Sequence, residues 1–147
     1  MEILDEVRGR HDELLEMLSN LKIMLKPELL GIKPNAQAAH EHLCLLGKKL
    51  KQHLSEEDRG VYPPLLTHED PKLKSLAWGF ISGEKPLRKQ FESYYQKWLK
   101  ECDFSFNEAF LQETEEVFSA IESRIQREQA VLLPRLEESG VFAAAEN

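Results

Sequence analysis

Two segments of the chain carry the same pattern of polar side chains. His53 precedes Glu57 by four residues, and Arg124 stands in the same relation to Glu128. In each segment two hydrophobic residues and a proline follow, and the proline lies ten residues after the first member of the pair. Because four residues make about one helical turn, the two side chains of each pair share a helix face. His53 and Glu57 therefore form either half of a metal site or an internal hydrogen-bonded pair.

The second pair differs from the first in its chemistry. Imidazole and carboxylate ligands suit iron, manganese or zinc, whereas the guanidinium of Arg124 stays protonated and cannot be a ligand. Its positive charge can instead take the place of a metal ion, paired in bidentate form with Glu57 or Glu128. The replacement of histidine by arginine thus limits how far the second copy supports a metal site.

The elements that must position these residues are helical. Apolar residues recur every three or four positions, without strand-like alternation or a glycine-rich phosphate loop. Four helices are expected, over about 3–26, 36–62, 71–101 and 107–137, and the third is expected to kink, or to stop and restart, at 82–86. Long helices with short connections predict an all-α, up-down-up-down four-helix bundle. The bundle is expected to form one domain over 1–147, with an ordered core at about 3–138.

Local signals predict where these helices begin and which faces they bury. Asn35 is the expected N-cap of the second helix. Asp70, followed by a proline at the first helical position, is the expected cap of the third. The consecutive prolines at 63–64 remove backbone donors and are expected to end the second helix near residue 62. The inner face of the fourth helix is expected to continue through Glu128 to Val131.

The inner faces of the predicted helices carry an unusual number of polar and charged residues. These are His11, His53, Glu57, Glu84, Arg124 and Glu128. An unpaired buried charge is destabilising by several kcal/mol, so the six are expected to meet and to satisfy one another, bind a metal, or face a water-filled pocket. In an up-down bundle, His11 and the two pairs fall at one end. Glu84 joins them only if the third helix is long or restarts.

Composition excludes several classes of function. The formal charge of −7 argues against nucleic acid and against anionic membranes as partners. No apolar run approaches the roughly 20 residues that a membrane span needs, and the acidic start of the chain lacks the apolar segment of a signal peptide. Cys44 and Cys102 form no CxxC pair. A reduced, cytoplasmic protein is the expectation.

These residues together resemble the hemerythrin-like, or HHE cation-binding, family. The family pattern has a histidine early in its first helix, which His11 matches. Its second helix ends in His-x-x-x-Glu followed by an aliphatic residue, an aromatic residue and proline, which the segment from His53 to Pro63 matches. Its fourth helix has His-x-x-x-Glu or Asp, and this chain has Arg124 and Glu128 there. The resemblance covers most of the chain.

The third helix of the family carries one or two histidines, and this chain has none there. One register places Glu84 and Arg88 at those positions, and an offset of one residue places Lys85 and Lys89 there. Family members bind a di-iron centre through about five histidines and bridging carboxylates, and this chain departs from that set at about three positions. The resemblance therefore implies a single mononuclear site, with ligands drawn from the set His11, His53, Glu57, Glu84 and Glu128.

The resemblance also suggests a function. Some family members carry dioxygen, and others sense oxygen, redox state or iron. We expect a cation-binding domain with a degraded site for one iron, manganese or zinc ion, which acts in binding or sensing and is neither an oxygen carrier nor an enzyme. The alternative is a metal-free regulatory module that binds a protein partner. A third interpretation, a small peroxidase or ferroxidase, requires redox-active iron; no other catalytic motif is present.

Overall fold

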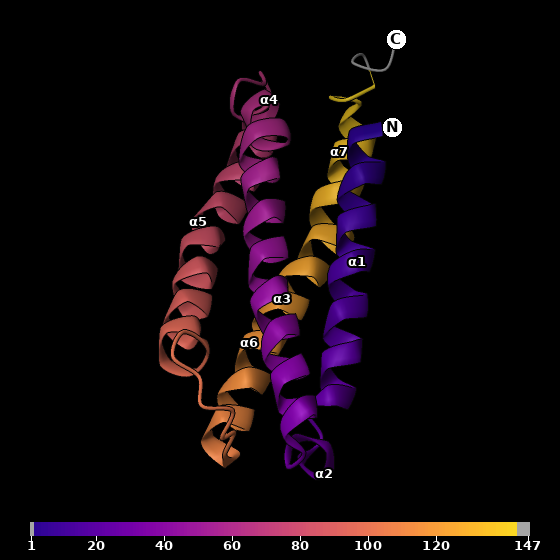
Figure 1. Ribbon diagram of the computed structural model, residues 1–147. Helices are drawn as coiled ribbons and strands as arrows, with labels where there is room; N and C mark the ends of the chain where they lie inside the picture. The colour runs from indigo at the N-terminus through magenta and orange to yellow at the C-terminus, as the bar shows by residue number, and fades with distance from the viewer. Residues whose placement is uncertain (1, 144–147) are drawn as a thin grey trace.

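Four long helices run side by side in alternating directions (Figure 1). The computed structural model describes residues 2–143, and every regular element in that range is helical. The long helices are α1 (Glu2–Met24), α3 (Lys33–Gly60), α5 (Pro71–Tyr94) and α6 (Glu108–Arg127). The predicted all-α bundle is confirmed. The predicted domain limits, 1–147, extend beyond the described residues at both ends.

Shorter helical segments connect and extend the long ones. α2 (Pro27–Leu30) and α4 (Tyr62–Leu66) lie in the connections on either side of α3. Two five-residue π-helical segments, η1 (Tyr95–Leu99) and η2 (Glu128–Leu132), continue α5 and α6, and α7 (Leu133–Ser139) continues η2. α7 therefore ends beside the start of α1 (Figure 1). No described helix combines the length and apolar composition that crossing a membrane requires.

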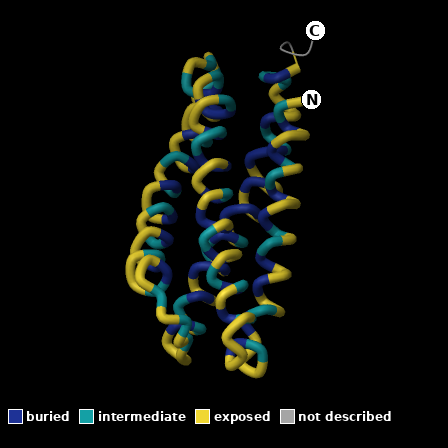
Figure 2. Tube along the Cα trace, viewed as in Figure 1, coloured by how far each residue is buried: buried dark blue, intermediate teal, exposed yellow. Residues whose placement is uncertain are grey.

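The hydrophobic core is divided into two parts by a layer of polar residues. Along α1, the cluster near the chain ends includes Val7 and the other cluster begins at Leu14. At the end of α3, Leu54 belongs to the cluster that includes Leu14, and Val61, directly after the helix, belongs to the cluster that includes Val7. The buried residues face one another across the bundle (Figure 2). Apart from Thr114, the buried polar and charged side chains thus lie between two apolar layers.

The expected start of the second helix was wrong by a few residues. α3 begins at Lys33, after Ile32 in the N-cap position, with Pro34 in its first turn. A proline is tolerated there because the first backbone donors of a helix have no partner within it. Asn35 lies inside the helix, and its side-chain amide donates to the Leu29 carbonyl at 3.1 Å. It therefore ties α3 to α2 and does not cap α3.

Of the two alternatives for residues 82–86, a kink or a stop and restart, the stop and restart was wrong. α5 runs without a break from Pro71 to Tyr94, with Pro86 inside it. Pro86 has no backbone N–H, so the carbonyl of Ser82 loses the donor that the helix would give it. Both residues are exposed, and water can therefore satisfy that carbonyl. The predicted cap at Asp70 is confirmed, since its carboxylate accepts from the Lys72 backbone amide at 2.9 Å.

The expected burial of Val131 was wrong because the helix changes its pitch. From Glu128 the backbone bonds run to the fifth residue on, as in the bond from the Leu133 amide to the Glu128 carbonyl. This π-helical turn inserts one residue, so the next buried position moves from Val131 to Leu132. Val131 is 45% exposed.

Candidate metal centre

The structure brings all six predicted polar residues into the one buried layer. α1 contributes His11, α3 contributes His53 and Glu57, α5 contributes Glu84, α6 contributes Arg124, and η2 begins with Glu128. Each of these residues is at most 5% exposed. Within each pair, the two side chains share a helix face because they are separated by about one turn. Side chains from all four long helices and from η2 thus meet at this level of the bundle.

Three of the residues form a compact triad. Oε1 of Glu128 lies 3.0 Å from Nε2 of His11 and 3.2 Å from Nε2 of His53. The two imidazole rings are 5.1 Å apart and inclined at 67°. One ligand atom from each residue lies within 4.8 Å of the other two. Two imidazole nitrogens and one carboxylate oxygen are a donor set that suits a single iron, manganese or zinc ion.

The other two predicted ligands lie beside the triad and outside that set. Oε1 of Glu57 is 3.4 Å from Nε2 of His53 and 3.6 Å from Nη2 of Arg124. Oε1 of Glu84 is 3.7 Å from Nη2 of Arg124. Glu57 therefore lies between His53 and the guanidinium, and Glu84 lies beside the guanidinium.

Several buried polar atoms in this layer have no hydrogen-bond partner among the described residues. They are Nδ1 of His11, both carboxyl oxygens of Glu57, and Oε1 of Glu84. A buried polar atom without a partner is destabilising, and such atoms mark places where an ion or water belongs. Unused carboxyl oxygens next to two imidazoles fit the addition of a cation, so the residues present are compatible with a metal.

Arg124 is held at the centre of the carboxyl groups by three short hydrogen bonds. Its Nε donates to Oε2 of Glu128 at 2.7 Å, its Nη1 to the Phe80 carbonyl at 2.6 Å, and its Nη2 to the Tyr62 hydroxyl at 2.6 Å. At Gly83 a side chain would lie 3.2 Å from Nη1, so the glycine leaves room for the guanidinium. The arginine is thus a fixed internal cation.

Comparison with protein families gives a match to this chain. The model of the hemerythrin HHE cation-binding domain matches residues 2–136, which run from α1 into α7. The chain belongs to the HHE cation-binding family. No curated protein and no solved structure matched it.

The carboxyl groups of this HHE domain differ sharply in their acidity. Burial, with the nearby Glu128 carboxylate, raises the pKa of Glu57 well above its usual range. Burial opposes ionisation of Glu128 too, but the interactions with Glu57 and both histidines hold its pKa well below the usual range. Glu128 is therefore the carboxyl group that ionises more readily, and it is the one paired with Arg124.

Burial also disfavours charge at two other groups in the layer. It lowers the pKa of His53, against the opposing effect of Glu128. It raises the pKa of Glu84 to about 8, and the neighbouring Asp58 adds to this effect. Burial thus favours the neutral forms of His53 and Glu84 in this layer of the HHE domain.

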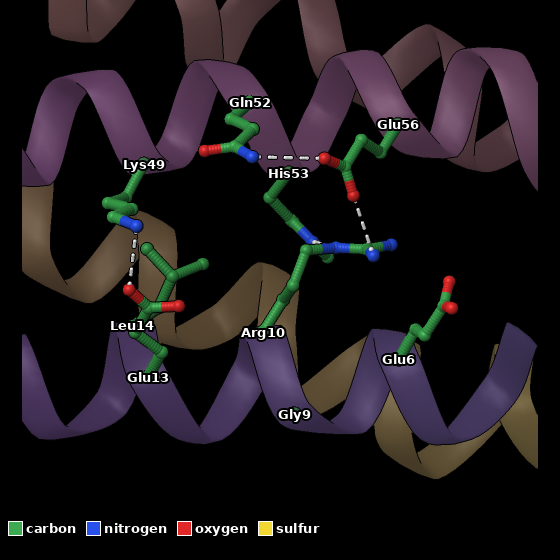
Figure 3. Close-up of a pocket in the computed structure, with 9 residues that line it drawn as sticks. All are labelled: Glu6, Gly9, Arg10, Glu13, Leu14, Lys49, Gln52, His53 and Glu56. Carbon is green, nitrogen blue, oxygen red and sulfur yellow. Dashed lines mark hydrogen bonds and ion pairs between the residues drawn. The ribbon is translucent and has the colours of Figure 1, made fainter. Parts of the chain in front are cut away.

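Sequence reasoning missed one residue that contacts the triad. The Nε of Arg10 donates to Nδ1 of His53 at 3.2 Å, and its Nη1 pairs with Glu56 at 2.7 Å. Arg10 reaches across from α1 to α3 (Figure 3). Its place next to His11 in the sequence carries no signal of this contact, because the contact depends on the register between two helices. Tyr62 could have been found, since it is the aromatic residue of the matched family element.

Proposed function

We propose that this HHE domain binds one divalent cation through Nε2 of His11, Nε2 of His53 and Oε1 of Glu128. The observation that carries the proposal is the position of Arg124 among three carboxyl groups, at 2.7 Å from Glu128 and within 3.7 Å of the other two. A guanidinium placed there contributes the positive charge that a second metal ion would supply in a dinuclear site. The carboxyl groups are then left with room for one ion.

The protein's own residues set the properties of such a site. Glu128 is oriented by Arg124 on one oxygen, which leaves the other oxygen facing the two histidines. Tyr62 and the Phe80 carbonyl orient Arg124 in turn. An ion held by the triad would supply positive charge there and, in the case of iron, a redox couple.

The burial of the triad supports binding or sensing over catalysis. His11, His53 and Glu128 are almost inaccessible to solvent. We propose a sensor of iron, oxygen or redox state in the cytoplasm, and not an oxygen carrier. The half-buried free thiols of Cys44 and Cys102 support the choice of a reducing compartment. The nature of the triad supports iron, manganese or zinc.

A thermal shift measurement tests the proposal. An ion that binds only the folded chain stabilises it by about 2.7 kcal/mol at 100 times its Kd. The melting temperature should therefore rise when Fe²⁺ or Zn²⁺ is added without oxygen. The rise should be lost in His11→Ala and His53→Ala and kept in His42→Ala, which removes an exposed imidazole. An equal rise in all four proteins would place the ion elsewhere and contradict the proposal.

The second candidate is a metal-free module that binds a protein partner. Two observations favour it: Arg124 and Glu128 already neutralise each other, and Trp78 is 58% exposed on α5. An exposed tryptophan is a typical anchor of a protein interface. Melting that is unchanged by metals would select this candidate. A third, an oxidoreductase, would be selected by a visible absorption band that responds to oxygen or peroxide.

A further inference from the structure

A groove of about 440 Å³ lies between α1 and α3 and reaches His53 of the proposed cation site. His53 is among its lining residues, as are Arg10 and Glu56 (Figure 3). Arg10 and Glu56 are joined by an ion pair of 2.7 Å, and their side chains are 20% and 32% exposed. Arg10, which also contacts His53, is therefore partly accessible from the groove.

The contact between Arg10 and His53 determines where the histidine carries its proton. The Nε of arginine always bears hydrogen, so Nδ1 of His53 must be the acceptor in this hydrogen bond. A neutral imidazole that accepts at Nδ1 carries its hydrogen on Nε2, where it donates to Oε1 of Glu128. The Arg10 contact thus selects the form of His53 that cannot offer Nε2 to a cation.

Coordination by Nε2 requires the opposite arrangement. A neutral imidazole that gives its Nε2 lone pair to a metal carries its hydrogen on Nδ1, and that nitrogen then needs an acceptor. Arg10 is only a donor, and its charge also repels a cation at the triad. Glu56, which already lies next to Arg10, is a carboxylate that can accept from Nδ1 once the guanidinium has moved.

We propose that Arg10 is a latch on the cation site, closed against His53 in the metal-free protein and displaced into the α1–α3 groove when the ion binds. Glu56 holds the latch in the first state and orients His53 in the second. The groove is the route by which a cation reaches the triad. This inference rests on the proposed function, and it adds a positioning residue that links the buried site to the surface.

Arg10→Met tests the latch, with Arg8→Met as its matched control. Both variants remove one arginine from α1, but Arg8 pairs with Asp5 and Glu137 at the surface and does not line the groove. A hydrogen bond to a charged group contributes enough that removing it should tighten Zn²⁺ binding by about tenfold. Competition with a chromophoric chelator measures this change, and Arg8→Met should stay within about twofold of the wild type.

Nitrogen-15 NMR of the imidazoles gives a second readout that a purely structural role of Arg10 would not produce. The metal-free wild type should show His53 protonated on Nε2, and the Zn²⁺-loaded protein should show it protonated on Nδ1.

The outcomes distinguish a failure of the Arg10 latch from a failure of the proposed cation site. Tighter binding by Arg10→Met alone, or binding by Arg10→Met where the wild type binds nothing, supports the latch. Equal affinities in the two arginine variants, or a metal-free His53 protonated on Nδ1, overturn the latch and leave the cation site standing. A failure of wild type and Arg10→Met alike to bind Zn²⁺ overturns both.

Discussion

Replacement of Arg124 by methionine should destabilise the fold severely. The change keeps an apolar stem of similar length and removes the guanidinium alone. Glu128 then loses its 2.7 Å partner, and the Tyr62 hydroxyl and the Phe80 carbonyl lose donors at 2.6 Å. Removal of one member of a buried ion pair costs about 3–5 kcal/mol, because the other charge stays buried without compensation.

The same structure predicts how pH and metal should modify this loss. Below the pKa of the remaining carboxyl groups the uncompensated charge is neutralised, so the loss caused by Arg124→Met should shrink at acidic pH. A divalent cation should also restore part of the stability, since positive charge would return to the layer. Both effects follow from charge, and neither follows from a loss of packing.

Denaturant unfolding at pH 7 in the presence of a chelator measures the effect. Arg127→Met is the matched control, because Arg127 lies one turn further along α6 and is exposed. Its effect should stay within about 0.5 kcal/mol, as for other surface substitutions. A loss below about 1 kcal/mol for Arg124→Met, or one equal to that of the control, would refute the role of Arg124 as the internal counter-charge.

Two further predictions concern packing and pH. Gly47→Ala should destabilise the protein by about 1–3 kcal/mol, because its new carbon would clash with the ring of Phe91. Gly79→Ala has open space around it and should stabilise by about 0.5–1 kcal/mol. Thermal unfolding measures both, and a stabilising Gly47→Ala or a destabilising Gly79→Ala would contradict the corresponding prediction. The pKa of Glu84 is raised to about 8 by burial and Asp58, so the folded state holds a proton that the unfolded chain releases. That stabilisation is complete below about pH 4.5 and is lost as the pH rises to 8. Glu84→Gln should flatten this fall in the unfolding free energy, and an unchanged slope would contradict the assignment.

The helices could be predicted from the sequence because their periodicity and caps are local. Asp70 and Asn107 each accept a backbone hydrogen bond at the start of a helix, as their residue types indicate. The exceptions depend on surroundings that a local pattern does not contain. Pro86 is tolerated because its side of α5 faces solvent, and the exposure of Val131 follows from a single inserted residue in a π-helical turn.

The site could be predicted as a layer but not as a set of ligands. Polar residues on the inner faces of four antiparallel helices must meet, because burial apart from one another would leave their charges uncompensated. Which carboxylate faces the histidines depends on side-chain rotamers, and these place Glu128, rather than Glu57, between His11 and His53. The contact of Arg10 depends on the register of α1 against α3, to which the sequence gives no guide.

The number of metal ions bound per chain tests the central claim most directly. The protein would be loaded with Fe²⁺ without oxygen, freed of unbound metal, and analysed for iron and for protein concentration. With Arg124 in the place of a second cation, the account predicts one iron per chain, lost on mutation of His53. Two irons per chain, or none, would contradict it.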